Sequence, residues 1–227
     1  MKILIGYHQR SGSTLLQHIL NEHSQIRSFS DISSLAVLPA ILLGYQPRGN
    51  VCIKPLDVFF TYESKIFYRR FDKLIWLARD PRDSYLSALE VNFAYNFWLP
   101  GPKIRGIDVG LLRRWRLIYR RYFKHPRQWH LLRYEDLVRK PKPALKALFR
   151  YLEIPYEKIY PFSEFQLLPN GGDPKMRGKT TIHKKSIHRY QDEMPLRQQR
   201  VFKRFLGNEM RKLGYLGQKK AKLTSSP

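Results

Sequence analysis

Short apolar runs alternate along the chain with segments in which apolar residues recur at helical spacing. Such short, β-rich runs are typical of buried strands, and they cover Lys2–Gly6, Asn50–Lys54, Lys73–Ala78 and Gln128–Arg133. Helices are expected over Thr14–Asn21, Pro81–Phe93, Asp108–Phe123 and Pro141–Leu152. This alternation predicts a single three-layer α/β/α domain over residues 1–215, with a central parallel sheet between two layers of helices. Residues 216–227 are expected to form a flexible basic tail.

Composition and charge narrow the class of protein. The 227 residues, 43% of them hydrophobic, can bury one sizeable core, and the formal net charge of +24 favours anionic partners. The single cysteine excludes a disulfide framework within the chain, and no apolar run is long enough to span a bilayer. The apolar start of the chain is too short for a secretory signal, so a cytoplasmic protein is expected.

An anion-binding loop is expected after the first strand. The segment His8-Gln9-Arg10-Ser11-Gly12-Ser13-Thr14 joins that strand to an apolar helix, a layout in which backbone N–H groups and a helix N-terminus face a phosphate. Gly12 lets the backbone approach closely, while Ser13 and Thr14 add hydroxyl donors. The loop lacks the Gly-Lys-Ser/Thr ending of a Walker A loop, which argues against a kinase or NTPase. The alternative is a serine-rich turn that caps the helix.

A second anion site is expected at the end of Lys73–Ala78. That strand runs into Arg79-Asp80-Pro81-Arg82-Asp83-Ser84-Tyr85-Leu86-Ser87, in which Arg79 can bind a phosphate through two parallel hydrogen bonds. Ser84 and Ser87 share one helix face, so one or both can point toward the same anion. A salt-bridged helix start is the alternative interpretation. Two separate anion sites at two strand ends are harder to explain in that way.

These motifs resemble those of a known family. The run from Arg10 to Leu16 is similar to the 5′-phosphosulfate loop of sulfotransferases that use 3′-phosphoadenosine 5′-phosphosulfate (PAPS), and Arg79 through Ser87 resembles their 3′-phosphate motif. Arg133-Tyr134-Glu135-Asp136-Leu137 resembles a characteristic strand-end sequence of the same family. The resemblance covers about residues 2–155 and implies a P-loop-like fold. The donor contacts it implies are Arg10, Ser11, Gly12, Ser13, Thr14, Leu15, Arg79 and Ser87.

A third segment extends the resemblance toward the C-terminus. Gly171–Lys179 is similar to the glycine-rich basic loop that closes over the donor nucleotide in this family. Arg177, Gly178 and Lys179 are therefore further donor-binding candidates. The alternative is a flexible basic loop.

The resemblance also implies which residues carry out the transfer. The tyrosylprotein and glycan branches have a carboxylate shortly after the first helix, and this position falls on Asp31, which would accept the acceptor's proton. Asp31 could equally be the N-cap of a helix that begins at Ile32. Lys54 matches a lysine that contacts the bridging oxygen, and Lys54 and Arg10 would stabilise the leaving oxygen. No metal is required or expected, because basic side chains can neutralise the charge on the reacting groups.

The histidine base of the cytosolic branch has no counterpart in this sequence, because the stretch that would carry it is Ile53-Lys54-Pro55-Leu56-Asp57. The chain therefore resembles the tyrosylprotein, glycan and bacterial branches more closely. His8 and His23 are further base candidates, although His23 is expected to face outward from a helix end and to be structural.

The acceptor is left open as a small molecule, a glycan or glycolipid, or a tyrosine. The aromatic segment Asn92–Pro100 could line an acceptor pocket or pack in the core. The basic face of the Asp108–Phe123 helix is a solvated surface, or it binds an anionic acceptor or a peripheral lipid surface. A basic nucleic-acid-binding protein and a P-loop kinase-like phosphotransferase are the alternative functions, but no nucleic-acid motif is present and no nucleic-acid partner is expected.

Overall fold

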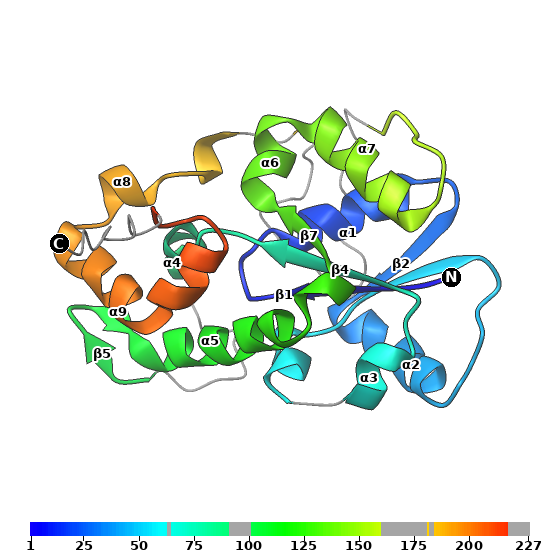
Figure 1. Cartoon of the computed structure of the whole chain (residues 1–227), viewed down its shortest axis with the longest axis horizontal. Coiled ribbons are helices and arrows are strands. Elements are labelled where there is room, and N and C mark those ends of the chain that lie inside the picture. The colour runs from blue at the N-terminus through cyan, green and yellow to red at the C-terminus, as the bar shows by residue number, and fades with distance from the viewer. Residues whose placement is uncertain (63–64, 91–100, 160–180, 182–183, 218–227) are drawn as a thin grey trace, which may run out of the picture.

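In the computed structural model, a five-stranded parallel sheet lies between two layers of helices (Figure 1). The structure describes residues 1–62, 65–90, 101–159, 181 and 184–217. The strand order is β2-β3-β1-β4-β7. Their bounds are β1 Lys2–Tyr7, β2 Ile26–Ser30, β3 Asn50–Lys54, β4 Lys73–Ala78 and β7 His130–Arg133. The predicted α/β fold with a central parallel sheet is thus confirmed.

Helices α1, α6 and α7 lie on one side of the sheet, and α2, α3 and α5 lie on the other (Figure 1). Their bounds are α1 Ser13–Glu22, α2 Asp31–Leu42, α3 Lys65–Arg69, α5 Val109–Lys124, α6 Tyr134–Arg139 and α7 Pro141–Leu152. The remaining helices are α4 Pro81–Leu89, α8 Tyr190–Glu193 and α9 Leu196–Lys212. A short hairpin, β5 Lys103–Ile104 with β6 Ile107–Asp108, precedes α5. A 3-10 helix, η1 (Asp57–Thr61), follows β3.

Three of the four predicted strands, β1, β3 and β4, are almost wholly buried, whereas only one of the four residues of the edge strand β7 is buried. All six residues of β1 are buried, as are five of the six in β4. The edge strand β2 was not predicted, because its sequence Ile26-Arg27-Ser28-Phe29-Ser30 mixes charged and hydroxyl residues with apolar ones. An edge strand can expose one side to water, so it needs no continuous apolar run.

The sheet places the expected site residues at one edge. All five strands are parallel, so their carboxyl ends meet at the same edge, where α/β proteins bind ligands. The central strand β1 pairs with β3 on one side and with β4 on the other. The segments that follow these three strands therefore lie next to one another.

Two expectations from the sequence concern membrane-spanning segments and the C-terminal tail. Among the described residues, no helix is long and apolar enough to cross a membrane. The expected basic tail falls largely on residues 218–227, which lie outside the described part of the chain.

Candidate functional site

The loop that joins β1 to α1 has an unusual backbone. Arg10 and Gly12 both adopt left-handed conformations, with φ angles of 64° and 91°. A side chain at position 12 would place its Cβ only 2.4 Å from the ring of Tyr134, so glycine is required there on two grounds. Ser13 begins α1, and the Leu15 side chain is buried in the core, so only the backbone of Leu15 is available to a ligand. The loop thus has the predicted strand–loop–helix layout.

The two predicted anion motifs contact each other. Arg79 lies at the end of β4 and donates from Nη1 to the carbonyl of Arg10, at 2.8 Å. In return, Arg10 donates from Nε and Nη2 to the hydroxyl of Ser87, at 3.3 and 3.2 Å. Residues separated by 77 positions in the sequence therefore form one polar centre at the carboxyl ends of β1 and β4.

Tyr134 and Ser186 complete the surroundings of Arg79, and sequence reasoning did not select either of them. The Arg79 guanidinium lies 4.4 Å from the centre of the Tyr134 ring and donates to the Ser186 carbonyl at 2.5 Å. The hydroxyls of Tyr134 and Ser186 are 2.8 Å apart. Tyr134 belongs to the strand-end sequence that carried the family resemblance, so its position after β7 could have indicated this contact.

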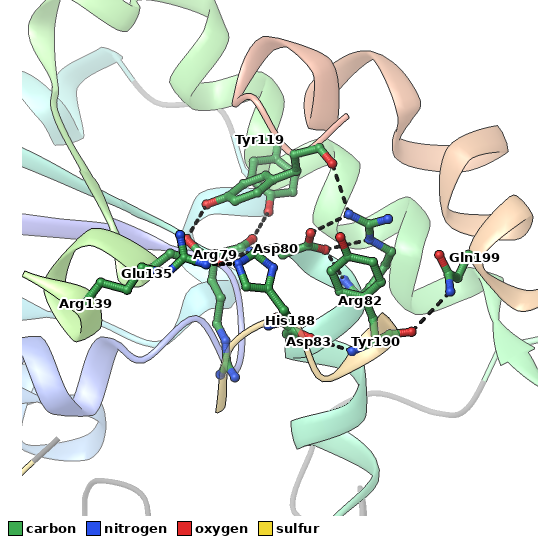
Figure 2. A network of polar contacts seen from close by, with 11 residues as sticks. Arg79, Asp80, Arg82, Asp83, Tyr119, Glu135, Arg139, His188, Tyr190 and Gln199 are labelled. Atoms are coloured by element: carbon green, nitrogen blue, oxygen red, sulfur yellow. Dashed lines mark hydrogen bonds and ion pairs between the residues drawn. The ribbon is translucent and has the colours of Figure 1, made fainter. Parts of the chain in front are cut away.

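The rest of the second motif forms a salt-bridged helix start, as the alternative interpretation proposed. Arg82 binds both carboxylate oxygens of Asp80, at 2.9 and 2.6 Å, and Asp83 accepts from the backbone amides of His188 and Tyr190. The Arg79 guanidinium points away from the Asp80–Arg82 pair (Figure 2). The motif therefore divides into a structural part, which anchors α8 to α4, and a part directed at the loop.

Asp31 and Lys54 form an ion pair at the same edge of the sheet, where the carboxyl ends of the strands lie. Lys54 Nζ lies 2.6 Å from Asp31 Oδ1 and 3.5 Å from the hydroxyl of Tyr7. Lys54 is only 2% exposed, whereas the Asp31 side chain is 19% exposed. Asp31 is not the N-cap, because α2 begins at Asp31 itself and Ser30 and Ser33 form its capping box. The capping alternative for Asp31 is therefore wrong, and the carboxylate is directed at the lysine.

A second carboxylate, Asp57, lies beside the loop and was not among the predicted site residues. Its Oδ2 accepts from the backbone N–H of Gln9 at 3.2 Å and from Arg114 Nη2 at 3.0 Å. Burial raises the pKa of Asp57, and the neighbouring Arg114 opposes that shift. Arg114 was expected to belong to the basic, solvated face of the Asp108–Phe123 helix, and this was wrong, because its side chain is only 8% exposed.

The two histidine candidates are both buried. His8 packs against Trp115 and Tyr119, and its Nε2 lies 3.1 Å from the hydroxyl of Ser84. Ser84 is therefore engaged beneath the loop, whereas Ser87 contacts Arg10. Burial, followed by the charges of Arg79 and Arg114, lowers the pKa of His8 to about 3. The His8 ring is fully buried against these aromatic side chains, an environment that agrees with a structural role.

His23 does not face outward as expected. It is 1% exposed, and its Nε2 lies 2.9 Å from the carbonyl of Pro155. The segment after α7 covers this end of α1, a contact that local sequence cannot reveal. The structural role expected for His23 agrees with this environment, but the predicted orientation was wrong.

The buried neutral His8 makes a testable contribution to acid sensitivity. Because its folded pKa of about 3 lies below the ordinary 6.5, the unfolded chain takes up a proton first as the pH falls below about 6.5. His8→Gln should remove a stability loss of up to about 1.4 kcal/mol per pH unit between pH 6.5 and the folded pKa. Urea unfolding of both proteins at pH 7.5, 6 and 5 measures this slope. Parallel stability profiles would show that His8 titrates normally in the folded protein.

Several predicted residues cannot be placed. Arg177, Gly178 and Lys179, together with the aromatic segment Asn92–Pro100, lie outside the described residues. Within the described part of the chain, no group of three or more histidine, cysteine, aspartate or glutamate side chains is arranged to hold a metal.

The described residues fit a polar, anionic ligand at the loop. Ser11 Oγ and Arg79 Nε are both buried, and neither has a hydrogen-bond partner among the described residues. Buried polar atoms without protein partners are uncommon, because each one costs free energy. Both atoms are hydrogen-bond donors that a phosphate or sulfate oxygen could use.

The fold matches that of known proteins. The chain has the fold of three solved sulfotransferases, which are the sulfotransferase domain from the curacin biosynthetic pathway, the sulfotransferase domain from the Synechococcus PCC 7002 olefin synthase, and mouse sulfotransferase SULT7A1 complexed with PAP. Their TM-scores are 0.63, 0.62 and 0.62, and their sequence identities are 18%, 15% and 14%. The alignments cover 90%, 90% and 92% of this chain and 96%, 94% and 84% of the three structures.

Part of the sequence also matches a family model. Residues 72–158, from β4 to the end of the segment after α7, match the Sulfotransferase family. No curated protein matches the chain in sequence at a significant level. The resemblance to sulfotransferases that the loop and the Arg79–Ser87 motif indicated is confirmed.

Proposed function

We propose that this chain is a sulfotransferase that moves a sulfuryl group from PAPS to the hydroxyl of an acceptor. The observation that carries the proposal is the contact between the two anion motifs, in which Arg79 binds the Arg10 carbonyl and Arg10 binds Ser87. One site with two phosphate-binding ends suits a nucleotide with phosphates at its 3′ and 5′ positions. The family match and the PAP complex of a protein with the same fold support this donor.

The loop after β1 would hold the 5′-phosphosulfate. Backbone N–H groups at the start of α1 and the hydroxyls of Ser13 and Thr14 can donate to its oxygens, and the helix dipole favours the negative charge. At the other end, Arg79 and Ser87 would hold the 3′-phosphate. Arg177, Gly178 and Lys179 are proposed as additional donor contacts.

The Asp31–Lys54 pair would carry the chemistry. Asp31 accepts the proton of the acceptor hydroxyl as the acceptor oxygen forms its bond to sulfur on the side opposite the leaving oxygen. The bond between sulfur and the phosphate oxygen breaks, and Lys54 with Arg10 stabilises the charge left on that oxygen. Lys54 Nζ lies 2.6 Å from Asp31 Oδ1, so the proposed base and the proposed cation for the leaving oxygen are adjacent.

The acceptor bears a hydroxyl in this proposal, and its remaining chemistry is open among the classes considered above. A cytoplasmic location is likewise proposed. Turnover can be tested by incubating the protein with PAPS and a panel of sugars, phenols and tyrosine peptides, with release of adenosine 3′,5′-bisphosphate as the signal. Magnesium-dependent phosphate transfer from ATP, without release from PAPS, would favour the kinase-like alternative.

Arg79→Ala is expected to weaken binding of adenosine 3′,5′-bisphosphate by about 1.5–3 kcal/mol, the usual contribution of a charged hydrogen bond. The variant should also lose the preference for this ligand over adenosine 5′-monophosphate, because the lost contact is with the 3′-phosphate. Calorimetric titration with both nucleotides measures the preference. Arg82→Ala, which breaks the neighbouring Asp80 pair, is the control and should keep it. An unchanged preference in Arg79→Ala would refute the assignment.

A further inference from the structure

The donor loop, residues Gln9–Ser13, has a backbone that the loop sequence alone does not favour. Arg10 has a β-carbon and yet adopts a left-handed conformation. Such a conformation costs free energy and persists only where the surrounding structure holds it. Two side chains that follow other strands form hydrogen bonds with the backbone of the loop next to this residue. Arg79 binds the carbonyl of Arg10, and Asp57 binds the N–H of the preceding Gln9.

Asp57 is itself fixed by a partner from a third element. Arg114 of α5 donates from one nitrogen, Nη2, to Asp57 Oδ2 at 3.0 Å and to Gln9 Oε1 at 3.1 Å. Gln9 is therefore held at its backbone by Asp57 and at its side chain by Arg114. The side chains of Arg114 and Asp57 are only 8% and 13% exposed, so solvent screens this ion pair weakly.

We infer that Asp57 and Arg114 are positioning residues that fix the donor loop in its anion-binding conformation. They lie outside both donor motifs and act on the ligand through Gln9. We call the Asp57–Arg114 pair the clamp. Backbone amides of the loop that are already oriented toward an anion bind it without a further ordering cost, so the clamp should increase affinity for the 5′ end of the donor. The inference rests on the proposed function.

The clamp is expected to act on one end of the nucleotide only. Arg114→Met should lower the affinity for adenosine 3′,5′-bisphosphate and for adenosine 5′-monophosphate about 10-fold, the usual effect of one lost hydrogen bond of moderate strength. Affinity for adenosine 3′-monophosphate, which depends on Arg79 and Ser87, should change less than about 2-fold. A purely structural role would weaken all three ligands equally.

The same helix offers a matched control. Arg121 of α5 donates to the carbonyls of Phe60 and Thr61, at 3.3 and 2.8 Å, and so ties α5 to the same 3-10 helix that carries Asp57. Arg121→Met removes an arginine contact between these elements without touching Gln9. It should lower thermal stability but leave the affinity for all three nucleotides unchanged.

If Arg114→Met does not fold, a second variant and a second measurement still test the inference. Asp57→Asn keeps an oxygen for the Gln9 amide but removes the charge, so it should weaken binding of the two 5′-phosphorylated nucleotides by a smaller factor. Hydrogen exchange at the Gln9 amide should accelerate about 10-fold in Asp57→Ala, where the acceptor is lost, and stay unchanged in Arg121→Met.

The outcomes separate this inference from the proposed function. If the wild type binds adenosine 3′,5′-bisphosphate and both Arg114→Met and Asp57→Asn bind all three nucleotides as the wild type does, the clamp is refuted while the donor assignment stands. An unchanged exchange rate at Gln9 in Asp57→Ala would refute it as well. If the wild type binds none of the three nucleotides, the proposed function fails and the inference fails with it.

Discussion

Asp31→Asn is expected to lower the rate of sulfuryl transfer about 10²–10⁴-fold, the range that a general base contributes. Asparagine is nearly the same size and can still accept a hydrogen bond from Lys54, but it cannot take up the acceptor's proton. Affinity for adenosine 3′,5′-bisphosphate should stay close to that of the wild type, because the donor contacts are made by other residues. Turnover from PAPS and calorimetric binding of the product nucleotide measure the two effects separately.

The exposed Asp192 of α8 provides a control for this substitution. Asp192→Asn makes the same chemical change outside the polar centre and should retain full turnover. If Asp31→Asn also retained full turnover, Asp31 would not be the base, and Asp57 would become the carboxylate to test next.

Lys54→Met is expected to lower turnover about 10²–10³-fold, as the loss of one group that stabilises a developing oxyanion does. It should also reduce stability, because Asp31 loses the partner that lies 2.6 Å away. Lys54→Arg keeps the charge and should recover part of the rate. Single-turnover measurements with saturating PAPS separate this chemical effect from any change in donor binding.

Lys73 of β4 is a suitable control for Lys54. It forms an ion pair of the same length, 2.6 Å to Glu153, but it lies at the amino end of its strand and therefore at the opposite edge of the sheet. Lys73→Met should leave turnover unchanged. Wild-type turnover in Lys54→Met would show that another cation stabilises the leaving oxygen.

The central strands, and the layout of the two anion motifs at strand ends, could be predicted because both rest on local sequence. Strands buried on both faces require continuous apolar runs, as in Lys2–Tyr7 and Lys73–Ala78. Phosphate loops require glycine and hydroxyl residues directly before a helix. Each of these features can be recognised from a short stretch of sequence. In the structure, Arg10 contacts both Arg79 and Ser87.

The contacts that were missed depend on pairings between distant segments. Ser30 of β2 lies beside Lys54 of β3 in the sheet, and this register alone brings Asp31 next to the lysine. Because the polar edge strand β2 gave no strand signal, the Asp31–Lys54 ion pair was not predicted. The Asp57–Arg114 pair joins residues 57 positions apart, and nothing in either local sequence specifies the other.

The most direct test of the account is calorimetric titration of the wild-type protein with adenosine 3′,5′-bisphosphate and, in parallel, with adenosine 5′-monophosphate at the same ionic strength. The two motifs at adjacent strand ends predict saturable binding of both nucleotides, with the bisphosphate bound at least about 10-fold more tightly because of its contact with Arg79. Equal affinities, or no binding of the bisphosphate, would contradict the assignment of this site to a PAPS-dependent sulfotransferase.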